Sequence, residues 1–173
     1  MRGITVKITF VSNYFNHHQK ELADELAMIL GDGYTFISTE PMEDERKKLG
    51  WELELPKYVH RSYIDDVHYE QSIDIIDSAD VVIFGSAPEK MIKNRIKEKK
   101  LILRYSERPL KKGLEIHKYP FRFLKWRLKN PPQAPIYLLC ASAYTSTDYA
   151  KFGLFKNRTY KWGYFPKLIL YKD

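Results

Sequence analysis

Polar side chains that could bind a ligand or move a proton are concentrated in one stretch near the amino terminus. Residues 10–19 read FVSNYFNHHQ, so a hydroxyl, three amides, a phenol and two imidazoles follow one another closely. An imidazole can hydrogen-bond a ligand hydroxyl or transfer a proton near neutral pH, which makes His17 the best chemical candidate of the stretch. A second interpretation stays open, because Asn16 can cap a following helix and both histidines can fill its exposed first turn.

Such a stretch needs a strand before it and a helix after it to hold its side chains in place. Residues 4–11 alternate and are rich in β-branched side chains, which predicts a strand, and residues 18–30 carry apolar side chains at helical spacing. A first strand that runs into a helix N-terminus is a common ligand site in open α/β sheets. No glycine lies between Val11 and Leu30, so the stretch differs from a glycine-rich phosphate loop.

The remaining pattern predicts alternating strands and helices. Further strands are expected at residues 34–38, 58–63, 80–85, 101–105 and 136–141. Helices are expected at residues 66–78, from 89 to about 99, and in part of 113–129, where Pro120 should break or kink the helix. About six strands result, which predicts an α/β fold: a Rossmann-like three-layer domain with a mainly parallel sheet. The aromatic end of the chain predicts no seventh strand–helix unit.

Polar residues also follow three of the later strands. The loops read GSAP, SERP and ASAYTST, and their candidate ligand-binding residues are Ser86, Glu107, Arg108, Tyr144 and Thr145. The carboxyl ends of parallel strands meet at one edge of a sheet, so we expect these loops to line a single crevice. Alternatives stay open: Glu107 can pair with Arg104 or Arg108, and the others can be turn or cap residues. Asp65 and Asp66 allow a paired-carboxylate site, but a capped helix start is favoured.

Length and composition indicate a single domain without a membrane span. The 173 residues are enough for one well-buried core, and no apolar run approaches the roughly 20 residues that a span needs. The first residues pass directly into a strand pattern, so we expect no secretory signal and a cytoplasmic location. Cys140, the single cysteine, is expected to be a small buried residue, and neither a metal site nor a cofactor is predicted.

Charge is distributed unevenly along the chain. Residues 40–89 carry 5 Lys/Arg against 13 Asp/Glu, a balance of −8, whereas residues 90–129 carry 15 against 3, a balance of +12. The second half is therefore expected to meet an anionic partner: a nucleic acid, a phosphorylated substrate or an anionic membrane.

The stretch HKYPFRFLKWRLKN interleaves aromatic and basic side chains. Its candidate membrane-surface residues are Lys118, Arg122, Lys125, Trp126, Arg127 and Lys129. Aromatic rings at headgroup depth with cations on anionic lipid would give a peripheral location at the inner membrane face. In the alternative interpretation, the apolar side chains pack on the domain and the cations are only solvated.

Four segments together resemble the amino-terminal domain of the family 4 retaining glycosyltransferases, which have the two-domain GT-B architecture. They read ITFVSNYFNHHQKELADEL, SADVVIFGSAPE, ILRYSERPLKKG and KWGYFP, in this order along the chain. The resemblance implies the acceptor-binding side of an interdomain cleft. The family's donor-binding half, with two glutamates in an E-x7-E pattern, has no counterpart in these residues. We therefore expect an acceptor domain, 1–173, that is inactive alone and meets a nucleotide-sugar donor through a missing C-terminal domain.

The resemblance also implies roles for the polar residues. Sugar transfer from a nucleotide diphosphate needs an oriented acceptor hydroxyl and a stabilised leaving phosphate. The expected catalytic residues are His17, which would hydrogen-bond the acceptor, and Glu107, while His18 is expected to be structural. The expected contacts to a glycan or lipid-linked acceptor are Asn13, Tyr14, Ser86, Arg108, Tyr144 and Thr145.

Two other functions are weighed against this one. The +12 segment suits a basic α/β nucleic-acid-binding module without catalytic activity, although it shows neither a helix-turn-helix nor an RNA-binding strand motif. A flavodoxin-like nucleotide-binding protein is disfavoured by the missing phosphate loop.

Overall fold

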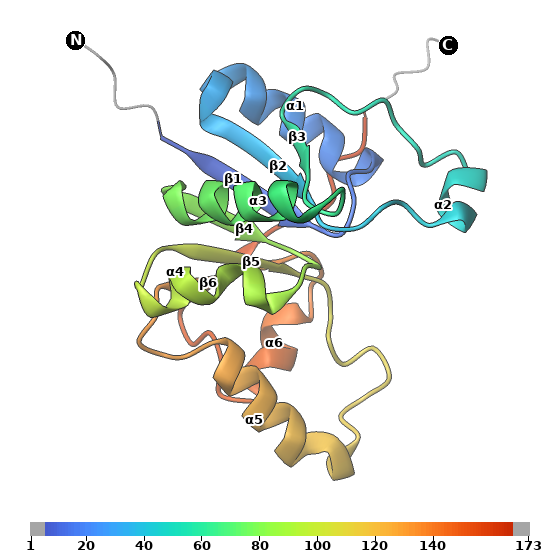
Figure 1. Ribbon diagram of the computed structural model, residues 1–173. Coiled ribbons are helices and arrows are strands. Elements are labelled where there is room, and N and C mark those ends of the chain that lie inside the picture. Colours follow the sequence, from blue (N-terminus) through green and yellow to red (C-terminus); the bar gives the residue numbers. More distant parts are fainter. Residues whose placement is uncertain (1–5, 168–173) are drawn as a thin grey trace.

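Seven parallel strands form one sheet with the order β3-β2-β1-β4-β5-β6-β7 (Figure 1). This computed structural model describes residues 6–167. The strands are β1 (Ile8–Ser12), β2 (Tyr34–Ser38), β3 (Val59–Arg61), β4 (Val81–Phe84), β5 (Ile102–Ser106), β6 (Ile136–Cys140) and β7 (Thr159–Lys161). The helices are α1 (His17–Leu30), α2 (Asp44–Lys48), α3 (Asp66–Ser78), α4 (Lys93–Lys97), α5 (Tyr119–Lys129) and α6 (Thr145–Ala150). The predicted α/β class and Rossmann-like layers are confirmed.

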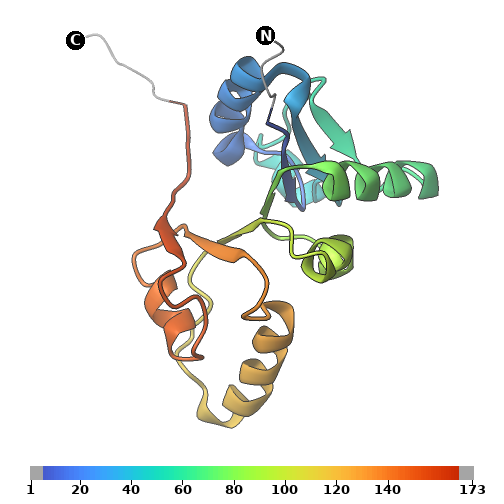
Figure 2. The same cartoon turned by 90° about the vertical axis from the view of Figure 1, so that its left-hand side faces the viewer.

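The direction in which the chain crosses the sheet decides which face each helix covers. From β1 the chain moves outward through β2 to β3, and it then returns to the other side of β1 as β4. Right-handed crossovers that run in opposite directions place their helices on opposite faces. Accordingly, α1 packs on one face, while α3, α4, α5 and α6 pack on the other (Figure 2).

The central strands are buried on both faces. In β1, Phe10 belongs to the core under α1, and Val11 belongs to the core on the opposite face. In β4, Ile83 belongs to the core under α1, and Val82 belongs to the core on the opposite face. A strand covered on both faces needs apolar side chains at successive positions, which explains the continuous apolar run that ends in Gly85.

Two helices begin at the capping residues that the sequence indicates. Asn16 Oδ1 accepts a hydrogen bond from the backbone N–H of His18 at 2.9 Å, so α1 begins at His17. Asp65 Oδ1 accepts one from the backbone N–H of His68 at 2.8 Å at the start of α3. Asp65 therefore caps a helix and is not half of a paired-carboxylate site.

Three elements differ from the expectation. The helix after β4 is short, because Glu89–Ile92 form a 3₁₀ turn before α4. Pro120 lies in the first turn of α5, where its missing N–H is not needed, so it begins the helix instead of breaking it. Thr159–Lys161 add a seventh strand that pairs with β6, without a further helix in the described residues.

Candidate functional site

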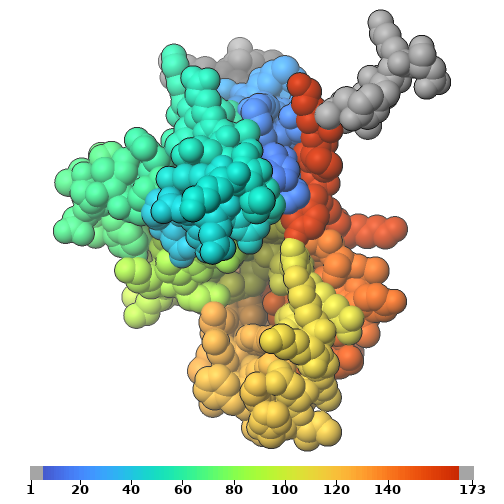
Figure 3. Space-filling model, turned by 90° about the vertical axis from the view of Figure 1, so that its right-hand side faces the viewer, coloured from blue at the N-terminus to red at the C-terminus, as the bar shows by residue number. Residues whose placement is uncertain are grey.

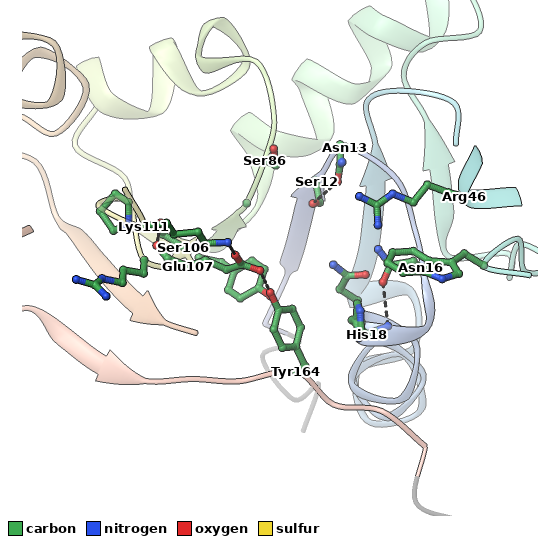
Figure 4. Close-up of a pocket in the computed structure, with 16 residues that line it drawn as sticks. Ser12, Asn13, Asn16, His18, Arg46, Ser86, Ser106, Glu107, Lys111 and Tyr164 are labelled. Atoms are coloured by element: carbon green, nitrogen blue, oxygen red, sulfur yellow. Dashed lines mark hydrogen bonds and ion pairs between the residues drawn. The ribbon is translucent and has the colours of Figure 1, made fainter. Parts of the chain in front are cut away.

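A pocket lies where β1 and β4 run side by side. The segments that follow these two strands lead to helices on opposite faces, so their loops separate and leave a depression between them. This depression, which we call the switch-point pocket, has a volume of about 550 Å³ (Figure 4). Figure 3 looks onto this end of the sheet, where the lining segments meet at the surface.

Four residues that the sequence selects line the switch-point pocket. Asn13 comes from the loop after β1, Ser86 from the loop after β4, and Glu107 and Arg108 from the loop after β5. They meet because β1, β4 and β5 are adjacent and parallel, and therefore end at the same edge of the sheet. The expectation of a common crevice is confirmed for these three loops, whereas the loop after β6 does not line the pocket.

Three other selected residues lie outside the pocket lining. Tyr14 is buried in the domain, with 8% of its surface exposed. Thr145 is fully buried at the start of α6, and its hydroxyl lies 2.8 Å from Ser142 Oγ. Tyr144 is exposed at the surface, with the Arg108 guanidinium 5.0 Å from its ring centroid. Because Tyr14 and Thr145 are buried outside the pocket lining, the described structure gives no support to their expected substrate contacts.

The ring centroids of the two adjacent histidines lie 4.0 Å apart, but only His18 belongs to the pocket lining. His17 lies edge to face with Trp51 at a centroid separation of 4.8 Å, and it does not line the pocket. His18 lines the pocket, and its ring centroid lies 4.7 Å from that of Tyr164. The pocket lining thus offers His18, whereas the sequence singled out His17, whose role stays a prediction.

His18 is a neutral imidazole at pH 7. Burial lowers the pKa of His18 below the ordinary 6.5, and the neighbouring His17 lowers it further, with partial opposition from the Glu107 carboxylate. Its Nδ1 is buried and has no hydrogen-bond partner among residues 6–167. A neutral ring can donate through one nitrogen and accept through the other, which suits a hydroxyl ligand.

Glu107 accepts hydrogen bonds from two directions at the rim of the pocket. The Lys111 ammonium and the Tyr164 hydroxyl donate to its two carboxylate oxygens (Figure 4). These contacts keep the carboxylate in a fixed position next to the pocket. Glu107 is thus paired with Lys111 and Tyr164, and not with Arg104 or Arg108 as the sequence suggests.

Both of those arginines are paired with other carboxylates. Arg104 makes two hydrogen bonds to Glu89, at 3.0 and 2.8 Å. Arg108 Nε lies 2.9 Å from a carboxylate oxygen of the buried Asp148. Burial raises the pKa of Asp148, but the hydrogen bonds from Arg108 and from the Leu110 backbone N–H, together with the charges of Arg108 and Lys151, hold that pKa below its usual value. Arg108 is thus anchored to α6 while its side chain borders the pocket.

The C-terminal segment, residues 162–167, closes one side of the pocket. The backbone N–H of Phe165 donates to the carbonyl oxygen of His18 at 3.1 Å, which ties the segment to the first turn of α1. Tyr164 then reaches across to Glu107, as Figure 4 shows. One segment near the end of the chain therefore connects the loops that follow β1 and β5.

Sequence reasoning missed several lining residues, among them Tyr105, Lys111, Tyr164, Gln19, Arg46 and Trp51. The last two come from the excursion between β2 and β3, where the hydrophobic pattern is lost and gives no signal. The Arg46 guanidinium lies 4.4 Å from the Trp51 ring centroid, and its side chain points into the pocket (Figure 4). Gln19 is 8% exposed, and its Oε1 has no partner within the described chain. A ligand hydroxyl would satisfy such an atom.

The residues expected at a membrane surface lie on α5 and beside it, away from the pocket (Figure 1). Trp126 does not point outward, because its ring packs against Phe152 at a centroid separation of 4.5 Å. This packing removes Trp126 from the expected surface set. The basic members, which remain exposed or half-buried, are Lys118, Arg122, Lys125, Arg127 and Lys129. No helix of the described residues is long and apolar enough to cross a bilayer.

Other kinds of site find no support in the described part of the chain. Residues 6–167 hold no group of three or more His, Cys, Asp or Glu side chains placed to bind a metal. Cys140 is half-buried outside the pocket, and burial raises the pKa of its thiol. Comparisons with protein-family models, curated proteins and solved structures gave no match. The switch-point pocket is therefore the starting point for a function.

Proposed function

We propose that this chain is the acceptor-binding domain of a retaining GT-B glycosyltransferase, which transfers a sugar from a nucleotide-sugar donor to a polysaccharide or lipid-linked glycan. One observation carries the proposal. Four separate segments resemble that family, and all lining residues of the switch-point pocket except Arg46 and Trp51 belong to them. Segments spread from residue 8 to residue 166 thus supply one site.

The chemistry of the pocket suits a hydroxyl-rich ligand. Asn13, Asn16 and Gln19 offer amide groups, Ser86 offers a hydroxyl, and Glu107 offers two carboxylate oxygens. A sugar presents many hydroxyls that both donate and accept, so mixed donors and acceptors on opposite walls match it better than a single-charge site would. The volume of about 550 Å³ is within the range of small-ligand pockets and can hold one or two sugar rings.

His18 and Glu107 take the central roles in this proposal. His18, and not His17, faces the pocket, so we assign to His18 the hydrogen bond that orients an acceptor hydroxyl. Glu107 is fixed by Lys111 and Tyr164 and would bind a second hydroxyl of the same sugar. The donor would approach from a domain opposite this pocket, which supplies the contacts to the leaving phosphate.

A titration of the ¹⁵N-labelled 173-residue chain tests the proposal. The probes are a panel of mono- and disaccharides, uridine diphosphate, a uridine diphosphate sugar and an RNA duplex. We expect at least one saccharide to shift the amides of Asn13, Gly85 and Ser106. Glu107→Gln should weaken that binding by about tenfold, the value of a hydrogen bond to a charged group, while the exposed Glu25→Gln on α1 should leave it unchanged.

Two outcomes would overturn the proposal. If the nucleotide probes shift these amides and no saccharide does, the pocket holds the donor or a free nucleotide. If the RNA duplex binds with a steep salt dependence and no saccharide binds, the chain is the basic nucleic-acid-binding module instead.

A further inference from the structure

Helix α5 has two apolar faces, and the domain covers only one of them. On the covered face, the rings of Tyr119 and Trp126 lie 4.8 and 4.5 Å from the ring of Phe152. On the opposite face, Phe121, Leu124 and Leu128 expose 70%, 58% and 72% of their surfaces. We call these last three residues the α5 stripe.

The α5 stripe is continuous along the helix. Its members are separated by three and four positions, which places them on one side of an α-helix. They line a shallow apolar depression of about 360 Å³ together with Lys125 and Lys129. Single exposed apolar side chains are common on protein surfaces, but a row of three large ones on one helix face indicates a contact surface.

Cations surround the α5 stripe. Residues 112–129 contain six Lys/Arg and one acidic residue, Glu115. Lys118 and Arg122 both pair with Glu115, and Lys129 pairs with Glu89 at 3.0 Å. Even with these pairs formed, the surroundings keep a net positive charge, and the Lys125 ammonium lies 6.0 Å from the Phe121 ring centroid.

Size and charge together identify the kind of partner. Three side chains expose on the order of a few hundred Å², less than the roughly 800 Å² that each partner contributes to a stable protein interface. An apolar row with flanking lysines and arginines fits the boundary between headgroups and acyl chains of an anionic bilayer. We propose that the α5 stripe docks this chain onto anionic lipid membranes.

In this arrangement, α5 lies in the plane of the membrane surface. Phe121, Leu124 and Leu128 enter the headgroup region, and the lysines contact anionic headgroups. Loop residues 107–111, which border the switch-point pocket, lead toward α5 (Figure 1). The proposal depends on α5 alone and stands whether or not the pocket binds a sugar.

Vesicle co-sedimentation of the whole 173-residue chain tests the docking. We expect binding to vesicles of phosphatidylcholine with 30% phosphatidylglycerol, and at least tenfold weaker binding to pure phosphatidylcholine. Leu124→Ser/Leu128→Ser should reduce the binding to anionic vesicles by at least tenfold, because two of the three inserted side chains are lost. The matched control is Met28→Ser/Ile29→Ser, which removes two equally exposed apolar residues, at 74% and 71%, from α1.

Other results of these experiments would show that the α5 stripe does not bind anionic membranes. Equal binding to both vesicle types, no binding at all, or equal effects of the two double variants would overturn the proposal. Analytical ultracentrifugation without lipid gives a further test. Concentration-dependent dimerisation that Leu124→Ser/Leu128→Ser abolishes would also overturn the proposal, because the α5 stripe would then contact a second copy. Matching circular dichroism and thermal melts of the two variants show that a loss of binding does not come from unfolding.

Discussion

Three side chains form a connected row across the switch-point pocket. Tyr164 lies between the other two: its ring is next to His18, and its hydroxyl donates to Glu107. Burial raises the pKa of the nearby Tyr105 to about 12, and Glu107 raises it as well, so that phenol stays protonated at neutral pH. The pocket therefore presents an imidazole of lowered pKa, the protonated phenol of Tyr105 and the carboxylate group of Glu107.

The pKa of His18 predicts a pH dependence of folding. Because that pKa lies below 6.5 in the folded protein, the unfolded chain binds more protons below pH 6.5, and stability falls as the pH falls through that value. We expect the NMR titration of His18 to give a midpoint below 6.5. The loss of melting temperature between pH 7.5 and 5.5 should be smaller in His18→Asn.

The prediction about the pKa of His18 has a control variant and one result that would contradict it. The exposed His117→Asn, on the turn before α5, should leave the titration of His18 unchanged. A midpoint at or above 6.5 for His18 would show that its ring is solvated and not held in the pocket wall.

Tyr164 is expected to fasten the C-terminal segment. Tyr164→Phe removes the hydroxyl that bonds Glu107, so the free energy of unfolding should fall by about 1 kcal/mol. The amide of Phe165 should also exchange with solvent faster, because its bond to the His18 carbonyl loses support. Urea unfolding and hydrogen exchange measure both effects.

Tyr160→Phe is the matched control for this change. Tyr160 is a 57% exposed tyrosine on β7, outside the pocket. If both variants behave alike, the contact between Tyr164 and Glu107 contributes nothing to the position of the segment.

At the scale of elements, one buried arginine joins a short helix to the sheet. Arg95 on α4 is fully buried, and its guanidinium donates to four backbone carbonyls, of Ile76, Ala79, Asp80 and Leu101. These carbonyls lie at the end of α3 and in the turns that lead into β4 and β5. A five-residue helix is too short to be stable by its own hydrogen bonds. The Arg95 side chain therefore fixes α4, and with it the segment between β4 and α4 that contains Ser86.

Arg95→Met tests this role. The new side chain fills much of the space but leaves the carbonyls without donors, so we expect a loss of about 3 kcal/mol in the free energy of unfolding. Lys97→Met, on the exposed side of the same helix, should change it by less than about 0.5 kcal/mol. A loss below about 1 kcal/mol for Arg95→Met would mean that water replaces the guanidinium.

At the scale of the whole molecule, the order of the strands creates the pocket. β1 and β4 are neighbours in the sheet but are followed by segments on opposite faces, and Gly85 lies directly after β4 at this point. A Cβ at Gly85 would meet Ser12 Oγ at 3.1 Å and Tyr105 Cδ1 at 3.3 Å. The backbone there is close-packed against both neighbouring strands.

Gly85→Val is expected to fill the floor of the pocket. Binding of a saccharide that shifts the wild-type amides should weaken by more than tenfold, whereas overpacking should cost only about 1–2 kcal/mol of stability. Calorimetric titration and urea unfolding separate the two effects. Unchanged saccharide binding in a folded Gly85→Val would place the ligand elsewhere.

The fold and three of the four polar loops follow from local sequence. Hydrophobic periodicity predicts β1, α1, β2, α3, β4, β5 and β6, because burial on one or both faces imposes a period that a short window reveals. Asn16 and Asp65 mark helix starts, since caps act on neighbouring N–H groups. Parallel strands then bring Asn13, Ser86 and Glu107 to one edge.

The tertiary structure alone decided which of several similar neighbours takes each role. His18 lines the pocket and His17 does not, although their rings are in contact, and the ring of His18 packs against Tyr164, far along the chain. Trp126 is covered and Phe121 is exposed, because Phe152 packs on one side of α5. Arg46 reaches the pocket from a segment without periodicity. Such choices depend on contacts between residues distant in sequence, which no local window contains.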